Sequence, residues 1–454
     1  MKSALGMVGR KAMRGLLLVA LGVAVLIGSP QPAWADTPLV GIGASVEDVD
    51  DAAGFRRVAG LAADDATVAE SFDRPTVYSD RRFGIPLTED EAGIIADQIK
   101  AQNALIPAAE AATKLAGFSG VYFERGTLHV LVTGDLETAR VALEATRPAS
   151  GQLVIEHATV DHRTLEGIRT AILSDQDLAA LGATFSTVAI DPVTSRVELT
   201  VKGSDPVDEV AELLATKYGD AVVVLTTEAS ISALACNSQE DCGLKGGLSG
   251  RHTSPGVTCT TGFIARMGTT SLNRIITAGH CIEDAGGPPN NYAWKNYSGT
   301  MFWGYNSTYQ YDALNDIGFI TVECAVACNK YFASGPSDIR TVRLTWATDA
   351  GMPVGRYVCR SGHTSNWDCG YINRTDVSAV YDGLIHYGLW EVTPKSTYGD
   401  SGAGYVALEA DQSYVIPYGI LSAGQTGVGA LYTYYYPANN AGYYNTYPCT
   451  VSGC

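Results

Sequence analysis

The tetrapeptide Gly399-Asp400-Ser401-Gly402 places a serine next to glycine, directly after Ser396-Thr397-Tyr398 and before Ala403-Gly404. Small neighbours leave the hydroxyl approachable, and glycine permits backbone angles that can point two N–H groups at one spot. An acyl-transfer nucleophile needs both features. The tetrapeptide also fits an ordinary polar turn, so its interpretation depends on partners elsewhere in the chain.

A histidine and an aspartate occur upstream, each next to an apolar strand pattern. Arg274-Ile-Ile-Thr-Ala-Gly-His280-Cys281 runs through glycine into the histidine, and Asp316 opens the alternating run Asp316-Ile-Gly-Phe-Ile-Thr-Val322. A buried carboxylate needs a partner, which a histidine N–H can provide. Asp312 is the alternative carboxylate, but its position indicates a turn. A serine nucleophile needs a base, and the base needs an orienting acid, so we expect these residues to form a triad with Ser401.

Three segments resemble the motifs of the chymotrypsin-like serine proteases in the same order: Thr277-Ala-Gly-His-Cys281, Asn315-Asp-Ile-Gly318 and Gly399-Asp-Ser-Gly402. The segment 358–370 is similar to the secreted actinobacterial branch, the streptogrisin and α-lytic protease type. Gly246-Gly247 with Cys259-Thr-Thr-Gly-Phe263 resembles the start of its mature domain. The resemblance covers about residues 240–430.

The resemblance implies an all-β protease domain of two six-stranded antiparallel β-barrels, preceded by an α+β pro-region. It implies a secreted serine endopeptidase that hydrolyses peptide bonds through an acyl-enzyme intermediate, with no cofactor and no metal. A non-catalytic binding protein on a protease fold is one alternative, and an esterase or amidase with the same triad is another.

The same resemblance assigns roles to individual residues. It implies Ser401 as nucleophile, His280 as general acid/base and Asp316 as its orienter. The expected oxyanion-hole donors are the N–H groups of Gly399 and Ser401, and the expected loop anchor is the pair Asp400 and Arg360.

The substrate backbone is expected to pair with the strand Ser422-Ala423-Gly424 by β-augmentation. The pocket walls are expected to include Tyr398 and Leu421. Lys395 would favour acidic substrate side chains if it lay at the pocket base, and otherwise it is a solvated loop lysine.

The N-terminus indicates export. Four basic residues precede the apolar run 15–28, which is too short to span a bilayer comfortably, and Ala33-Trp34-Ala35 offers the small residues that signal peptidase accepts. We expect a signal peptide over 1–35, with an uncleaved membrane anchor as the alternative. A formal net charge of −17 argues against nucleic acid or an anionic membrane as partner. The expected product is a secreted, extracellular monomer that acts on polypeptides.

All ten cysteines lie between Cys236 and Cys454. An even number confined to one region of an exported chain predicts disulfides. Zinc is the competing interpretation for the two closest pairs, although export disfavours it. Pairing neighbours closes only short loops and gives Cys236–Cys242, Cys259–Cys281, Cys324–Cys328, Cys359–Cys369 and Cys449–Cys454.

The front of the chain, residues 36–230, has no cysteine and no convincing catalytic group. Residues 36–80 are expected to be loosely helical or partly disordered, and a helix with a break near Pro107 is expected from Thr88 to Leu115. The segments 118–135 and 185–205 resemble each other. Each indicates a β-hairpin, followed by a helix opened by Asp135 or Asp205 and a short closing strand.

These two copies predict tandem hairpin-helix-strand modules. By resemblance they form a pro-region that aids folding and occupies the site until it is removed, which leaves 231–454 as the protease domain.

Overall fold

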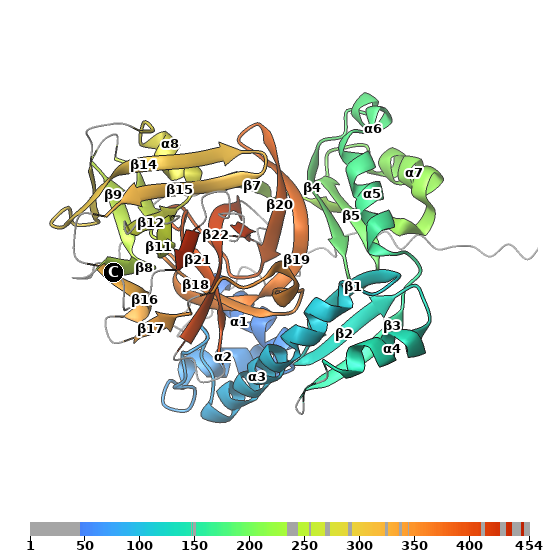
Figure 1. Ribbon diagram of the computed structural model, residues 1–454, viewed down its shortest axis with the longest axis horizontal. Coiled ribbons are helices and arrows are strands. Elements are labelled where there is room, and N and C mark those ends of the chain that lie inside the picture. Colours follow the sequence, from blue (N-terminus) through green and yellow to red (C-terminus); the bar gives the residue numbers. More distant parts are fainter. Residues whose placement is uncertain are drawn as a thin grey trace, which may run out of the picture. The chain divides into compact units, whose positions relative to one another are not determined.

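The fold is described from a computed structural model (Figure 1). It describes residues 46–146, 148, 151–233, 244–253, 256–267, 273–288, 293–322, 326–335, 338–343, 345–409, 414–426, 433–437 and 446–448. The expected signal peptide lies outside these residues, as does at least one cysteine of the pairs Cys236–Cys242, Cys324–Cys328 and Cys449–Cys454. We call residues 46–233 the front half and residues 244–448 the back half.

The front half opens with three helices, α1 (Val46–Ala59), α2 (Asp65–Asp73) and α3 (Glu89–Ala112). The first two are regular helices in a stretch where the sequence indicated looser structure. A capping box starts α3: Thr88 accepts the Glu91 N–H, and the Glu91 side chain accepts the Thr88 N–H. The expected break at Pro107 does not occur, because α3 continues through it. Burial of four apolar side chains on this stretch offsets the cost of the proline, namely Leu105, Ala108, Ala109 and Ala112.

The first module follows α3. It consists of β1 (Phe118–Glu124), β2 (Thr127–Val132), α4 (Leu136–Glu144) and β3 (Gln152–His157). β1 and β2 form an antiparallel hairpin, and β3 joins β2 in parallel, so that the sheet order is β1-β2-β3. The hairpin turn needs two positive φ angles, 47° at Arg125 and 84° at Gly126. The glycine at the second position accepts its angle without strain.

The second module repeats this order after the helices α5 (His162–Leu173) and α6 (Gln176–Ala180). It consists of β4 (Phe185–Asp191), β5 (Arg196–Lys202), α7 (Val207–Tyr218), a 3₁₀ turn η1 (Gly219–Ala221) and β6 (Val222–Thr227). Asp205 does not cap α7. The N-cap is Pro206, and the Asp205 carboxylate accepts the Thr184 N–H at 3.0 Å instead. A last strand, β7 (Ser230–Ala233), ends the front half.

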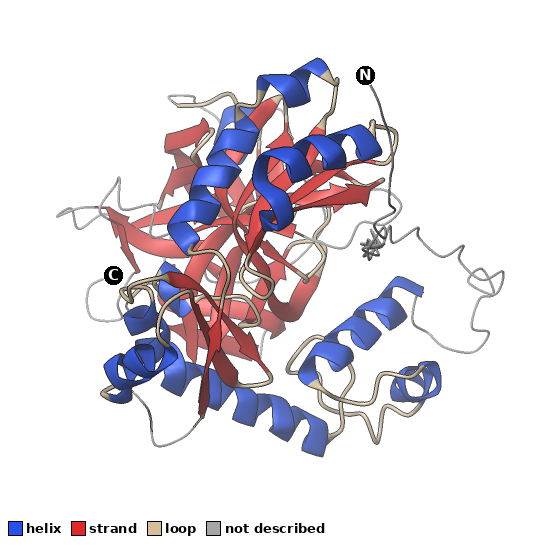
Figure 2. Cartoon of the chain, turned by 90° about the vertical axis from the view of Figure 1, so that its right-hand side faces the viewer, coloured by secondary structure: helices blue, strands red, loops and turns tan. Residues whose placement is uncertain are grey.

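Most strands of the back half pair in antiparallel register. Figure 2 shows the strands of the molecule in red and its helices in blue. The first sheet of the back half has the order β10-β9-β13-β14-β15-β12-β11-β24. The strands are β9 (Ser249–His252), β10 (Thr258–Thr260), β11 (Phe263–Met267), β12 (Asn273–Thr277), β13 (Ala293–Asn296), β14 (Phe302–Asp312), β15 (Asn315–Thr321) and β24 (Thr446–Pro448), with helix α8 (Gly279–Asp284) after β12.

The second sheet of the back half continues into the second module, with the order β6-β5-β4-β19-β18-β21-β22-β17-β16-β8. β20 bridges β19 and β23, and β23 returns to β22, which curls this end of the sheet. The strands are β8 (Leu244–Gly246), β16 (Val326–Gly335), β17 (Asp338–Val342), β18 (Tyr357–Gly362), β19 (Asn366–Tyr381), β20 (Leu384–Val392), β21 (Gly404–Leu408), β22 (Tyr414–Thr426) and β23 (Thr433–Pro437), with a 3₁₀ turn η2 (Asp349–Gly351).

The architecture is therefore β-rich with barrel-like sheets. The finer division of the back half into two six-stranded barrels stays a prediction. Among the described residues, Cys259–Cys281 ties β10 to α8, and Cys359–Cys369 joins directly opposite residues of β18 and β19. In the described part of the chain, no helix is both long and apolar enough to cross a membrane.

Candidate active site

His280 and Asp316 come from neighbouring elements of the first sheet. His280 lies at the start of α8, directly after β12, and Asp316 lies on β15, which pairs with β12. The fully buried Asp316 carboxylate accepts the His280 backbone N–H and its ring Nδ1–H, both at 2.8 Å. This contact assigns the tautomer, because Nδ1 carries the proton and leaves Nε2 as the basic nitrogen.

Close backbone approach explains the glycine before the histidine. A Cβ on Gly279 would lie 2.3 Å from the Gln310 carbonyl oxygen and 2.9 Å from the Ile317 nitrogen. Only glycine therefore lets α8 start against β14 and β15, which brings the imidazole to the carboxylate.

Burial and charge oppose each other in this pair. Burial alone lowers the pKa of His280, but the Asp316 charge and its hydrogen bond outweigh burial and raise the pKa above its usual range. Burial raises the pKa of Asp316, while His280 and hydrogen bonds from His280 and Ser422 lower it more strongly. The arrangement thus favours an ionised carboxylate beside a histidine of increased basicity.

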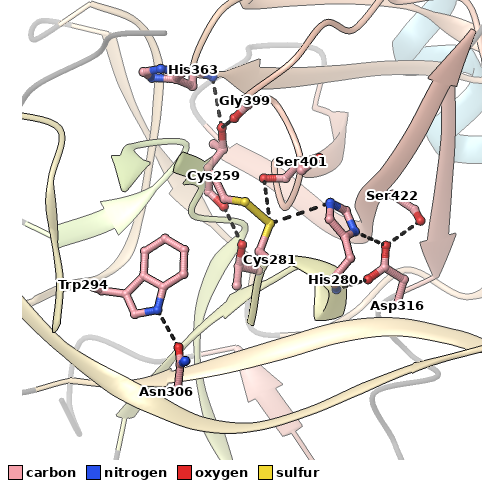
Figure 3. Close-up of a disulfide and its surroundings, with 12 residues drawn as sticks. Cys259, His280, Cys281, Trp294, Asn306, Asp316, His363, Gly399, Ser401 and Ser422 are labelled. Carbon is pink, nitrogen blue, oxygen red and sulfur yellow. Dashed lines mark hydrogen bonds and ion pairs between the residues drawn. A yellow bond between two sulfur atoms is a disulfide. The ribbon is translucent and has the colours of Figure 1, made fainter. Parts of the chain in front are cut away.

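Ser401 lies in the turn that precedes β21 and is buried. Its carbonyl oxygen accepts the Thr260 N–H at 2.8 Å. The sulfur of Cys281 lies 3.9 Å from the same oxygen and 3.8 Å from His280 Nε2. The Cys259–Cys281 disulfide therefore contacts both the serine loop and the imidazole, and Figure 3 shows Ser401, His280 and Asp316 gathered around it.

The glycines of this turn adopt conformations that other residues avoid. Gly399 has φ 99° and Gly402 has φ 86°. A Cβ on Gly402 would also lie 2.1 Å from Thr277 Oγ1. The carbonyl oxygen of Gly399 accepts the Thr260 hydroxyl at 2.7 Å, which holds the orientation of the peptide group that follows it.

Asp400 is fully buried beneath the turn. It accepts backbone N–H groups from Thr364 at 2.8 Å, Ser365 at 3.2 Å and Thr397 at 3.0 Å, and it also accepts the Ser365 hydroxyl. The expected partner Arg360 is buried too, but its guanidinium lies 3.8 Å away, as an ion pair without a direct hydrogen bond. Burial lowers the pKa of Arg360, but the charge of Asp400 opposes burial, and the net effect is a raised pKa. Segment 364–365 is thus the main support of Asp400.

The strand expected to bind substrate is part of β22. Ala423 and Gly424 pair in antiparallel register with Ala233 and Ser232 of β7, so the front half occupies this edge. The Ser422 hydroxyl donates to Asp316 Oδ2 at 2.5 Å, and the expected pairing of its backbone with substrate stays a prediction.

The other expected pocket residues differ in their exposure and contacts. Leu421 is fully buried in an apolar cluster, and its backbone bonds to Gly402 and Ala403 at 2.9 Å. Tyr398 is 50% exposed. The ammonium of Lys395 lies 2.9 Å from the Asp51 carboxylate of α1, an ion pair that the sequence did not suggest.

No protein-family model matches the chain. A segment of 153 residues is 29% identical to Streptogrisin-C of Streptomyces griseus and covers 33% of this chain and 30% of that protein. A segment of 86 residues is 35% identical to Serine protease 1 of Rarobacter faecitabidus and covers 19% of this chain and 15% of that protein. Parts of the chain are thus similar in sequence to streptogrisin-type serine proteases.

Three solved structures accompany these sequence matches. A Nocardiopsis protease aligns at 23% identity with a TM-score of 0.37, over 46% of this chain and all of that one. A glutamic acid-specific serine protease aligns at 21% with a TM-score of 0.37, over 45% of this chain and all of that one. The α-lytic protease homologue N4 aligns at 21% identity with a TM-score of 0.36, over 46% of this chain and all of that one. The matched segments span less than a third of the length of the curated relatives, so the similarity covers only part of those proteins.

Sequence reasoning missed several polar residues around this candidate site. Thr260 holds both Gly399 and Ser401, Thr364 and Ser365 hold Asp400, and Tyr381 contacts Ser422. Single Ser, Thr and Tyr residues carry no spacing signal. The only available hint was the cluster of small polar residues between Cys359 and Cys369.

In the described residues, no group of three or more His, Cys, Asp or Glu side chains is placed to hold a metal ion.

Proposed function

We propose that this chain is a secreted serine endopeptidase made as a preproprotein. The observation that carries the proposal is the buried Asp316–His280 pair beside the Ser401 loop. The kinship with streptogrisin-type proteases supports the same reaction.

In the proposed reaction, Ser401 Oγ attacks the carbonyl carbon of the scissile peptide while His280 Nε2 accepts the hydroxyl proton. The resulting imidazolium is stabilised by Asp316, which stays ionised. The N–H groups of Gly399 and Ser401 stabilise the oxyanion, a contribution of roughly 10²- to 10³-fold per donor in related chemistry. His280 then protonates the leaving amine. A water molecule hydrolyses the acyl-enzyme by the reverse proton transfers.

We further propose that residues 36–230 act as a pro-region after removal of a signal peptide over 1–35. The pairing of β7 with Ala423 and Gly424 supports this role, because β7 lies where an extended substrate would pair with β22. Cleavage after Ala233, at the end of β7, would start the protease domain a few residues beyond position 231, the boundary expected from the sequence, and would free this edge for polypeptides.

The test compares the full chain with Ser401→Ala and with Ser298→Ala, a control at an exposed turn serine. The wild-type chain and Ser298→Ala are expected to cleave peptides, to react with a covalent serine probe and to shorten from the precursor to the mature form. Ser401→Ala is expected to lose peptide hydrolysis by more than about 10⁴-fold and to remain a precursor.

Two outcomes would replace the proposal. A wild-type protein that turns over esters but no peptide is an esterase. A folded wild-type protein that the probe does not label is a binding protein. Maturation of purified Ser401→Ala would contradict self-processing alone.

A further inference from the structure

The Asp316 carboxylate lies at the end of a chain of buried hydrogen bonds. Ser422 Oγ donates to Asp316 Oδ2 at 2.5 Å, and the Tyr381 hydroxyl lies 2.7 Å from Ser422 Oγ. Ser422 has one hydroxyl proton, which the ionised carboxylate receives, so Tyr381 must be the donor in the second bond. The exposed fractions are 0% for Asp316 and Ser422 and 3% for Tyr381.

The ring of Tyr381 is held by a second histidine. His386, on β20, stacks on Tyr381 with ring centroids 3.8 Å apart and an interplanar angle of 6°. His386 Nδ1 lies 3.0 Å from the Tyr436 hydroxyl, which donates to the Ala313 carbonyl oxygen at 3.4 Å. This contact ties the stack to the loop that leads into Asp316.

Burial keeps His386 neutral. It lowers the pKa of His386, although Asp316, Asp382 and Asp312 all raise it, and His280 adds to the lowering. The neighbouring ring of Tyr311 covers both histidines, with centroids 5.6 Å from His386 and 5.8 Å from His280. A neutral His386 provides a flat ring that fixes Tyr381 without placing a second positive charge beside His280.

A serine hydroxyl can rotate among three staggered positions, and only one of them points at Asp316. The hydrogen bond from Tyr381 favours the rotamer in which Ser422 donates to the carboxylate, and cooperative polarisation strengthens that donation. We propose that Tyr381, supported by His386, is a positioning residue for the Asp316–His280 pair and acts through Ser422. This inference rests on the proposed proteolytic function.

The structure offers a matched control for its test. Tyr381→Phe and Tyr435→Phe each remove one hydroxyl from a buried tyrosine, but the Tyr435 hydroxyl has no hydrogen-bond partner in the described residues. Kinetics are measured on the matured enzyme and expressed per active site titrated with a covalent serine probe, so that only folded molecules are counted.

Tyr381→Phe is expected to lower kcat/KM about 3- to 10-fold, mainly through kcat, because one hydrogen bond to the acid–base assembly is lost. With less donation from Ser422, Asp316 presents more negative charge to His280 and raises its pKa further. The acid limb of the kcat/KM profile should therefore move to higher pH by a few tenths of a unit. Tyr435→Phe should change neither quantity.

A double-mutant cycle separates action through Ser422 from general damage. Tyr381→Phe should have no further effect on kcat/KM in a Ser422→Ala background, because the link to Asp316 is already broken. If Tyr381→Phe does not accumulate, His386→Leu serves instead, since it removes the stacked ring and keeps the hydroxyl. Its loss of kcat/KM should likewise disappear in the Ser422→Ala background.

The possible failures are distinguishable. A wild-type protein without peptide hydrolysis overturns the proposed function. An active wild type with Tyr381→Phe equal to Tyr435→Phe, or with additive losses in the cycle, overturns the role of Tyr381 and leaves the protease function standing.

Discussion

The two modules of the front half have the same order of elements but use the outer edge of their first strand differently. In the first module β1 ends its sheet, and its only ladder contact with the back half in the described residues is the isolated bridge Tyr122–Val354. In the second module β4 pairs on both sides, with β5 and with β19 of the back half. One module thus completes its own sheet, and the other extends a sheet of the back half.

Side-chain contacts follow the same division. Arg169, on α5, forms an ion pair with Asp376 at 2.6 Å, and the carboxylate of Glu198 on β5 lies 3.3 Å from the Arg374 guanidinium. The first module instead leaves the docking to α3, where Gln102 contacts the Gly355 carbonyl oxygen and the Tyr357 N–H. The repeated sequence pattern thus specifies the fold of each module. The outer edge of the module's first strand determines whether the module joins the sheet of the back half.

The largest effect is expected from a proline at the matched strand position. Val188 of β4 is fully buried and pairs with Ser378, while its counterpart Val121 lies on β1. Val188→Pro places a residue without a backbone N–H inside a strand that is paired on both sides, a position from which proline is excluded. It should reduce the yield of mature active enzyme more than about tenfold, measured by active-site titration. Equal losses for Val121→Pro and Val188→Pro would abolish the distinction between the modules.

A smaller effect is expected from the ion pair across the second interface. Arg169→Ala removes the contact with Asp376 and should cost about 1–2 kcal/mol. In the Ser401→Ala full chain, hydrogen exchange of the β4 and β19 amides should become faster. Arg140→Ala is the control, because Arg140 pairs with Glu137 within its own exposed helix. Unchanged exchange in Arg169→Ala would show that strand pairing alone holds the module.

The pH dependence of the same interface can be tested at Glu198. Burial raises the pKa of Glu198 more than Arg374 lowers it. A carboxyl with a raised pKa in the folded state contributes stability below its ordinary pKa of 4.5, and this contribution is lost as pH rises through the folded-state value. Exchange at β4 should therefore accelerate over that window in the Ser401→Ala chain. Glu198→Gln should remove this part of the pH dependence, and an identical profile would refute the assignment.

The smallest effect is expected at the helix starts. Asp135 caps α4 by accepting the Thr138 N–H at 2.8 Å, whereas Asp205 makes no such bond to α7. Asp135→Ala should lower the unfolding midpoint of its module by about 2 °C. Asp205→Ala should leave α7 intact and loosen only the turn at Thr184, as followed by amide exchange. If Asp205→Ala destabilised α7 more than Asp135→Ala destabilised α4, Asp205 would be a helix cap after all.

Local patterns indicated much of the front half. Alternation over 118–132 and 185–201 corresponds to the strands of two hairpins, because a two-residue period is a property of the chain itself. The break at Pro107 was wrong, since packing of the α3 face outweighs the local cost of proline. The cap at Asp205 was also wrong, because residues far apart in sequence compete for the same carboxylate.

The turn Gly399–Gly402 shows the same limit at the site. Its motif and those around His280 and Asp316 were readable in order along the chain, and the chain's relation to streptogrisin-type proteases agrees with them. The support of Asp400 by Thr364 and Ser365, and the ion pair of Lys395 with Asp51, had no local signal.

The sequence by itself determined the tandem modules, the strand-rich back half and the motifs that carry the candidate chemistry, because residue period and turn chemistry act over a few neighbouring positions. Only the tertiary structure decided that β4 joins β19, that β7 covers Ala423 and Gly424, and that Tyr381 reaches Asp316 through Ser422. These contacts join elements that are up to almost two hundred residues apart in the sequence. Their geometry depends on how complete sheets pack rather than on any one segment.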